Sequence, residues 1–104
     1  MKTSELSGAA LDWAVAKCEE VQWARWNLNG WSNDWTMGGP IIEREGLGVW
    51  MYQWNEQGEP ENGWYAEDKN GDHVRTGTTP LIAAMRCYVA SKLGDEVQIP
   101  EGVA

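Results

Sequence analysis

Residues 64–94 read WYAEDKNGDHVRTGTTPLIAAMRCYVASKLG, and this stretch decides the fold. Asn70-Gly71 strongly favours the tight turn of a β-hairpin, because both residues adopt positive φ at little cost. We therefore expect antiparallel strands at 64–68 and 72–76. The run 49–54 predicts another strand, since its β-branched and aromatic side chains pack well on a pleated surface.

The same stretch ends in the clearest helix of the chain. It has Pro80 at its first position and runs over 81–93, where Gly94 ends it. Thr78 and Thr79 are both candidates for its N-cap. Its expected buried face consists of Leu81, Met85, Tyr88, Val89 and Lys92.

Two further helices are expected. Segment 7–20 is rich in Ala and free of Pro, which favours a helix capped by Thr3, Ser4 or Ser7. Its apolar stripe recurs at spacings of three and four and comprises Leu6, Ala10, Trp13, Ala14 and Lys17. A middle helix is expected over 35–45, irregular near Pro40, which lacks an N–H group.

The remaining segments connect these elements. Residues 21–31 predict a short strand or an irregular loop, and residues 55–63 predict a solvated loop. Helices flanking a small antiparallel sheet of about three strands make an α+β domain. The chain of 104 residues is expected to form one domain over 1–104, with a partly ordered tail at 95–104.

Composition narrows the function classes. The formal net charge is −8, which argues against the phosphate-neutralising surface of a protein that binds long nucleic acid. No apolar run approaches the ~18 residues that a membrane span requires, and no signal-peptide pattern opens the chain. We therefore expect a cytoplasmic protein with no membrane partner. Cys18 and Cys87 are expected to be buried, reduced thiols.

Tryptophan is the compositional anomaly, since the chain has 8 Trp and no Phe. Indole rings are large and carry an N–H that needs a partner, so a core of this size cannot easily bury all of them. Most are expected to fill the core. Two or three should stay partly exposed in a groove or an interface, which also predicts a homo-oligomer.

Catalytic signatures are missing from the sequence. His73 is the single histidine and has no second ligand at metal-binding spacing. Neither a dinucleotide fingerprint nor a Walker-type phosphate loop is present. The sequence therefore predicts no metal, no cofactor and no catalytic residue, and a small hydrolase acting on nucleotides stays as an open alternative.

What remains is typical of a binding site. Two indoles surround Ser32, Asn33 and Asp34, which are candidates for the N-cap of the middle helix. Aromatic faces stack on bases whatever their identity. Trp50 and Trp54 lie four apart in a predicted strand and should share one face. The threonines before Pro80 mark another helix N-terminus, which attracts phosphate, and Arg75 or Arg44 could supply charge. The candidate ligand-binding residues are Trp31, Ser32, Asn33, Asp34, Trp35, Trp50, Trp54, Arg75, Thr78 and Thr79. The alternative for each is that it caps a helix or fills the core.

Segments 4–17, 38–46 and 79–97 resemble the small NinX-like proteins of tailed phages and their prophages. That family looks related to the phage ABA-sandwich domain, which implies a sheet layered with helices. Family members often have Tyr-Ser-Thr-Asp where this chain has Trp31-Ser32-Asn33-Asp34, so the resemblance does not carry a ligand across.

Phage accessory proteins of this size often counter host defences, some by sequestering signalling nucleotides. By this analogy we expect a non-catalytic protein that binds a small, nucleotide-derived ligand in the cytoplasm of the infected or lysogenic host. The alternative is an acidic interaction module that inhibits a host DNA-binding protein or nuclease. Its charge would come from the glutamates of residues 56–61.

Overall fold

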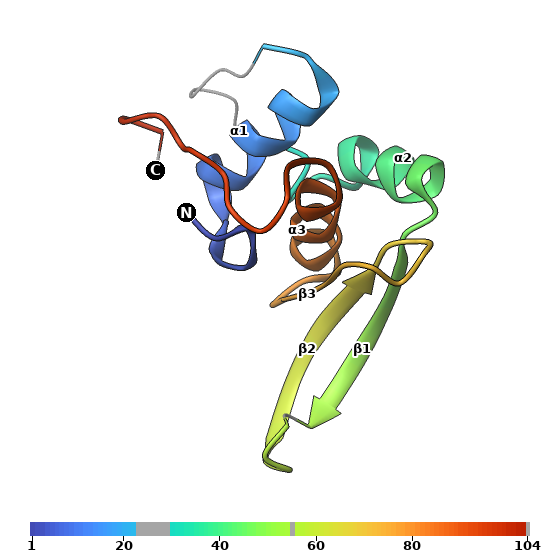
Figure 1. Cartoon of the computed structure of the whole chain (residues 1–104). Helices are drawn as coiled ribbons and strands as arrows, with labels where there is room; N and C mark the ends of the chain where they lie inside the picture. The colour runs from blue at the N-terminus through green and yellow to red at the C-terminus, as the bar shows by residue number, and fades with distance from the viewer. Residues whose placement is uncertain (23–29, 55, 104) are drawn as a thin grey trace.

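The computed structural model describes residues 1–22, 30–54 and 56–103, and at residues 54, 60 and 61 only the backbone (Figure 1). The expected strand or loop at 21–31 therefore falls largely outside the described residues, as do Trp23 and Trp26. The chain is an α+β domain with the elements η1 (Thr3–Glu5), α1 (Gly8–Glu19), α2 (Trp35–Glu45), β1 (Gly48–Trp54), β2 (Pro60–Glu67), β3 (Val74–Gly77) and α3 (Pro80–Leu93).

The sheet is an antiparallel meander in the order β1-β2-β3. β2 begins at Pro60, so the prediction of a solvated loop over 55–63 is wrong in its second half. Pro, Glu, Asn and Gly have weak strand propensity, and pairing with β1 overrides it. The register puts Tyr52 opposite Gly63 and Trp54 opposite Pro60, with an irregularity between these pairs.

The turn before β3 is longer than expected, and β3 starts at Val74. The Asp68 carboxylate accepts the backbone N–H groups of Asp72 and His73, at 2.7 and 3.3 Å, and this holds both residues in the turn. Gly71 has φ +75° but Asn70 has no positive φ, so this pair does not form the expected two-residue hairpin turn.

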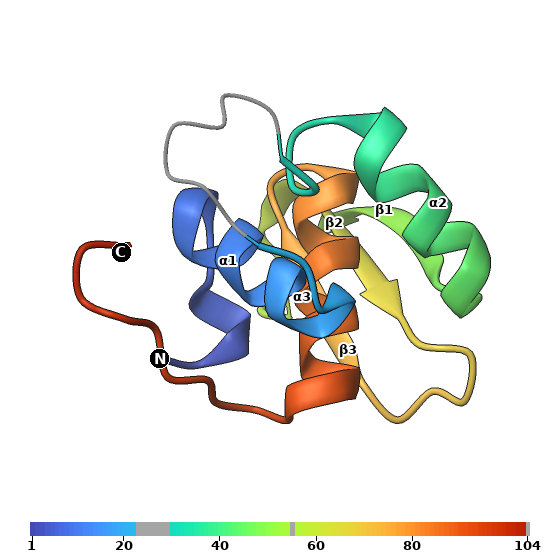
Figure 2. The same cartoon turned by 90° about the horizontal axis from the view of Figure 1, so that it is seen from above.

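α3 is the central element of the core (Figure 2). Thr79 is its N-cap and accepts a hydrogen bond from the Ile82 N–H at 3.1 Å, which decides between the two predicted threonines. The expected single buried face is too narrow, since Ala83, Ala84 and Cys87 are buried too. One side of α3 packs on the sheet and another on α1, so most of its circumference is covered, although Lys92 is exposed.

The predicted apolar stripe of the N-terminal helix is correct in part, since Leu6, Ala10 and Ala14 are buried. Leu11 and Val15 are fully buried, while Lys17 is exposed and Trp13 half-buried. Ala10 and Ala14 belong to both the predicted and the observed stripe. A small rotation of the helix about these two residues turns Leu11 and Val15, rather than Trp13 and Lys17, toward α3. Lys17 places its ammonium 5.4 Å from the centre of the Trp13 ring, at the boundary with solvent.

The middle helix has the predicted bounds and continues through Pro40 without a break. Asp34 caps it, and Gly46 ends it with φ +68°. No helix within the described ranges is long and apolar enough to cross a bilayer.

Residues near the two ends of the chain lie side by side (Figure 1). The backbone N–H of Thr3 donates to the Asp95 carbonyl at 2.8 Å, and that of Val97 donates to the Met1 carbonyl at 2.9 Å. Lys2 and Glu96 form an isolated antiparallel bridge. Val97 is buried, so this first part of the predicted tail is built into the domain.

The core contains little tryptophan. Trp13, Trp31 and Trp64 are partly buried against it, whereas Trp35 and Trp50 are exposed. None of the indoles that the structure describes is fully buried, so the expectation that most would fill the core is wrong for this part of the chain. Alanine, leucine, valine and methionine fill the centre with Tyr88 instead.

Candidate functional site

The N-termini of α2 and α3 meet in a surface depression of about 270 Å³, which we call the cap pocket. Its lining residues are Ser32, Asn33, Trp35, Thr79, Pro80, Leu81 and Ile82. The first three and Thr79 were predicted as site residues from sequence. The structure therefore brings the two predicted helix caps together, although they are more than forty residues apart in the chain.

Local hydrogen bonds shape the α2 side of the cap pocket. Asn33 accepts the Gly30 backbone N–H at 2.7 Å, which folds 30–33 into a turn. The Ser32 backbone N–H donates to the Asp12 carboxylate at 2.9 Å and so anchors this turn to α1. Gly30 lies against the same carboxylate, since a Cβ there would come within 2.2 Å of Asp12 Oδ2. Sequence analysis missed this role of Asp12.

Gly38 allows the two helices to come close. It is buried, and a Cβ at this position would lie 2.6 Å from both the Trp31 carbonyl oxygen and Leu81 Cδ2. A side chain would therefore push the start of α2 away from α3. The Gly38-Gly39 pair was visible in the sequence, but its contact with Leu81 depends on tertiary packing.

The two helix ends differ electrostatically. Asp34 accepts from the Thr36 hydroxyl and backbone N–H, at 2.6 and 2.9 Å, and these bonds lower the pKa of its carboxyl. Its negative charge therefore already occupies the positive end of α2. α3 has the neutral cap Thr79 and keeps its positive end, so an anion is better accommodated at α3.

Trp35 supplies the apolar surface beside these caps. Its side chain is 56% exposed, and Gly39 leaves room beside its ring, 3.8 Å from the position of a Cβ. Trp31 and Asp34 lie next to the pocket in the same turn, whereas Thr78 precedes the α3 cap and is exposed.

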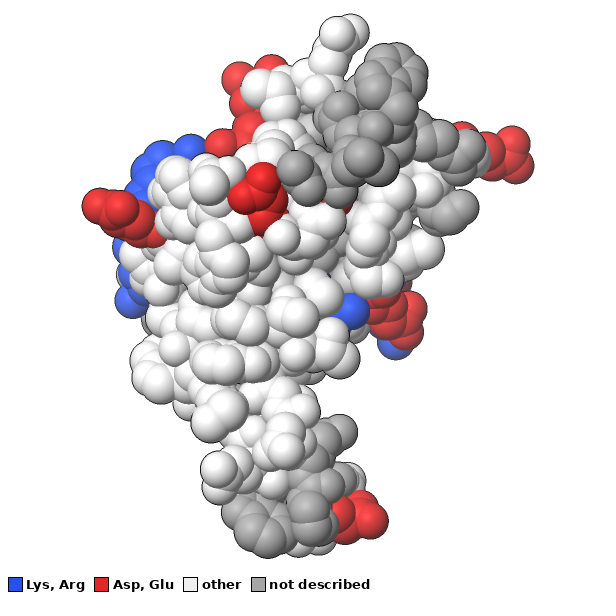
Figure 3. All heavy atoms as spheres, turned by 180° about the vertical axis from the view of Figure 1, so that it is seen from behind, with Lys and Arg blue, Asp and Glu red and all other residues white. Residues whose placement is uncertain are grey.

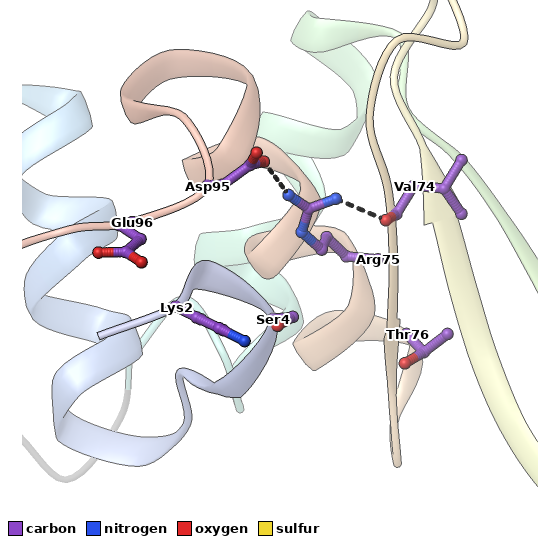
Figure 4. Close-up of a pocket in the computed structure, with 7 residues that line it drawn as sticks. All are labelled: Lys2, Ser4, Val74, Arg75, Thr76, Asp95 and Glu96. Carbon is purple, nitrogen blue, oxygen red and sulfur yellow. Dashed lines mark hydrogen bonds and ion pairs between the residues drawn. The ribbon is translucent and has the colours of Figure 1, made fainter.

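Arg75 lies in a second cleft, of about 480 Å³, between the N-terminal segment, β3 and the residues after α3 (Figure 4). Its guanidinium donates to Asp95 Oδ1 at 2.6 Å, to the Val74 carbonyl at 2.8 Å and to Thr3 Oγ1 at 3.4 Å. Lys2 and Arg75 are balanced in this cleft by Asp95 and Glu96. Arg75 thus ties the chain ends to β3 and does not face the cap pocket.

Trp50 lies on the sheet, away from both clefts. Its ring stacks on Tyr65 with a centroid separation of 5.3 Å and an interplanar angle of 25°. Trp50 and Trp54 were predicted to share one face, but the side chain of Trp54 lies outside the described residues. The ten candidate residues therefore belong to at least three places, of which the cap pocket unites the largest group.

One comparison places the chain among known proteins. Residues 2–92 match the family model described as "Bacteriophage P22, NinX". The chain belongs to this family. No curated protein gives a significant match. The cap pocket, α1 and α2 of this NinX-family chain lie within the matched segment, which ends one residue before the end of α3.

The thiols of this NinX-family chain are structural. Both are free; Cys87 is fully buried with its Sγ 3.4 Å from the His73 carbonyl, and Cys18 is half-buried. Burial raises the pKa of Cys18 to about 11 and that of Cys87 to about 12, so neither forms a thiolate near neutral pH. Among the described residues, no three His, Cys, Asp or Glu side chains gather to hold a metal ion.

A cluster of charged side chains joins the C-terminal ends of the three helices. Arg44 makes a double hydrogen bond to Glu19 at 3.0 and 2.8 Å, and its Nε donates to Glu45 at 2.8 Å. Lys92 pairs with Glu45 at 3.2 Å, and the buried Tyr88 hydroxyl donates to Glu19 at 2.5 Å. We call these five residues the helix-end cluster. It bridges α1, α2 and α3 and does not border the cap pocket.

The helix-end cluster predicts acid sensitivity. Hydrogen bonds from Arg44 lower the pKa values of Glu19 and Glu45 below their usual 4.5. The folded state therefore favours the ionised carboxylates; this stabilisation is complete above about pH 5 and is lost as the pH falls through 4.5 towards the lowered values. In urea melts from pH 7 to pH 3, Glu19→Gln should lower stability at pH 7 and flatten the acid slope. The exposed Glu43→Gln is the control, and an equally flattened slope there would contradict this assignment.

Proposed function

We propose that the chain is a non-catalytic phage accessory protein that binds a small, nucleotide-derived ligand in the cap pocket. The observation that carries the proposal is the meeting of two capped helix N-termini with a half-exposed indole in one depression. A base would stack on Trp35, and a phosphate would accept the Leu81 backbone N–H at the positive end of α3, since Pro80 has no N–H and that of Ile82 donates to Thr79. Sequestration of a host signal in the host cytoplasm would be the biological role.

Size and charge restrict the ligand. A volume of about 270 Å³ lies just below the ~300–1,000 Å³ of ordinary small-molecule sites, so the pocket suits one ring with its substituents. The net charge of −8 disfavours ligands with many phosphates and long nucleic acid. Ligands with one or two phosphates fit this combination best.

The binding experiment uses the full chain. A panel of mononucleotides, cyclic dinucleotides, cyclic trinucleotides and ADP-ribose would be titrated by calorimetry, with Trp fluorescence as a second readout. Trp35→Ala should weaken binding roughly 5- to 150-fold, because stacking of one base contributes ~1–3 kcal/mol. Trp35→Phe should retain most of the affinity.

Trp50→Ala provides the matched control, since Trp50 is also exposed but lies on the sheet. Equal losses in the two alanine variants would move the site away from the cap pocket. No binding across the whole panel would reject the nucleotide proposal. Recovery of unchanged ligand after incubation with Mg²⁺ or Mn²⁺ would separate binding from hydrolysis.

A second candidate function is an acidic module that inhibits a host DNA-binding protein or nuclease. It is favoured by the position of Glu56 and Glu59, which are exposed at the tip of the projecting β1–β2 hairpin (Figure 1). Capture of such a host protein should decline steeply with salt, and Glu56→Gln with Glu59→Gln should reduce it. If the amount captured depends on neither the salt concentration nor these substitutions, this function is contradicted.

A further inference from the structure

β1 forms an uncovered edge of the sheet. In the order β1-β2-β3, and within the residues that the structure describes, it pairs with a strand on one side only. Its seven residues, Gly48–Trp54, include no charged residue and no proline. Every second residue turns its N–H and C=O outward at such an edge, where another strand can pair with them.

The other edge strand is protected in the ways that natural sheets use. β3 has four residues and carries the charged Arg75, whose guanidinium contacts Thr3 and Asp95. The chain ends therefore lie against this edge (Figure 4). Short length, charge and a covering segment each discourage pairing. β1 has none of these, although 23% of the chain is charged.

The sheet face opposite α3 adds apolar surface beside this edge. Trp50 and Tyr52 lie on this face of β1, and both rings contact Tyr65 of β2, at centroid distances of 5.3 and 6.5 Å. Trp50 remains 47% exposed and Met51, on the opposite face, 56%. Seen from behind, the surface running down to the hairpin tip is almost free of charged side chains (Figure 3).

We infer that β1 pairs with β1 of a second copy of this chain, antiparallel about a two-fold axis at Met51. This register uses the whole strand and sets Trp50 of each copy opposite Tyr52 of the other. Aromatic cross-strand pairs of this kind stabilise sheets. The rings of Trp50, Tyr52 and Tyr65 from the two copies would then form one continuous row across the joined sheet. The two three-stranded sheets join into one sheet of six strands.

The strand sequence favours a second copy over a different partner. A two-fold axis requires a surface that is complementary to itself. An uncharged strand meets its own copy without placing like charges opposite each other, even though each chain carries a net charge of −8. A basic partner would instead require acidic side chains along β1.

Sedimentation of the full chain across the micromolar range tests the pairing. The expected mass at high concentration is twice 11.7 kDa. Met51→Lys places two ammonium groups side by side at the axis and should weaken association by about tenfold or more. Since Met51 is exposed, the melting temperature of the monomer should change little. Val74→Lys, at a 47% exposed position on the other edge, is the matched control and should leave the dimer intact.

A cross-link tests the register. Directly opposed residues of antiparallel strands have Cα atoms roughly 4.5–5.5 Å apart, within the range of a disulfide. Oxidation by diamide should link Met51→Cys into a covalent dimer, while Thr76→Cys on β3 should stay monomeric. The inference is overturned by a chain that is monomeric throughout, by equal cross-linking of the two variants, or by a dimer that Met51→Lys leaves unchanged.

Discussion

Gly38→Ala is expected to destabilise the protein by about 2 kcal/mol and to lower its melting temperature on the order of 10 °C. The new Cβ would lie 2.6 Å from the Trp31 carbonyl oxygen, which belongs to the backbone and cannot rotate away. It would lie equally close to Leu81 Cδ2, at the start of α3. Overpacking of this kind exceeds the ~1 kcal/mol that alanine gains over glycine in a helix.

Gly39→Ala is the matched control, because it makes the same chemical change at the next position. The nearest atom to its Cβ is Trp35 Cε3 at 3.8 Å, an ordinary contact. We expect this variant to be neutral or stabilised by up to about 1 kcal/mol. Thermal melts of both variants give the difference, and equal melting temperatures would show that α2 and α3 do not approach each other at Gly38. Loss of ligand binding should accompany Gly38→Ala.

Tyr88→Ala is expected to be the most damaging single substitution, at about 3–5 kcal/mol. Tyr88 is the largest of the fully buried side chains, and its ring packs in the core of the domain. Its hydroxyl also donates to Glu19 in the helix-end cluster and accepts from Arg44 at 3.1 Å. Truncation therefore leaves a cavity and removes the hydroxyl that bonds to α1 and α2, so that the pair of Lys92 with Glu45 is the cluster's remaining ion pair to α3.

Tyr88→Phe separates these two contributions, because it keeps the ring and removes the hydroxyl. Glu19 retains its two hydrogen bonds from Arg44, so the expected loss of stability is about 1–2 kcal/mol. Tyr65→Phe, on the partly exposed sheet face, should change stability by less than about 0.5 kcal/mol. Urea titrations of the three variants give the comparison. A Tyr88→Phe variant as stable as the parent would show that the hydroxyl bonds contribute nothing.

Local signals in the sequence were sufficient to predict the helices. The start of α3 is marked by Thr79 and Pro80, and its end by Gly94. In the same way α2 starts after Asp34 and ends at Gly46, so the bounds of both helices follow from neighbouring residues. Strand β2 could not be predicted in full, because its first residues are stabilised by β1 and not by their own propensity. Pairing between strands is a property of two segments, and one segment alone does not reveal it.

The buried faces of the helices depend on their neighbours. In α1, two overlapping stripes contain Ala10 and Ala14, and contact with α3 selects the one with Leu11 and Val15. α3 is covered on most of its circumference, so the expected single stripe is too narrow for it. Periodicity identifies a helix more reliably than it identifies the partner of each face.

The candidate site shows the same division. Both helix caps could be recognised from their own residues, since capping is local chemistry. Their meeting across Gly38 could not, because it depends on how α2 packs against α3. Arg75 lies close to Thr79 in the chain yet faces a different cleft. The extended strand β3, which ends at Gly77 between these two residues, carries the chain from one cleft to the other. The sequence alone does not specify the path of this strand.

The position of α3 in the chain has a consequence for synthesis. The helix on which the sheet and α1 pack leaves the ribosome after both of them, and residues 95–97 then join the N-terminal segment. Until α3 has emerged, the apolar faces of α1 and the hairpin have no partner, and domains fold as units. A nascent chain that stops before residue 80 is therefore expected to stay unfolded and sensitive to proteases, so the host's quality control can remove incomplete copies.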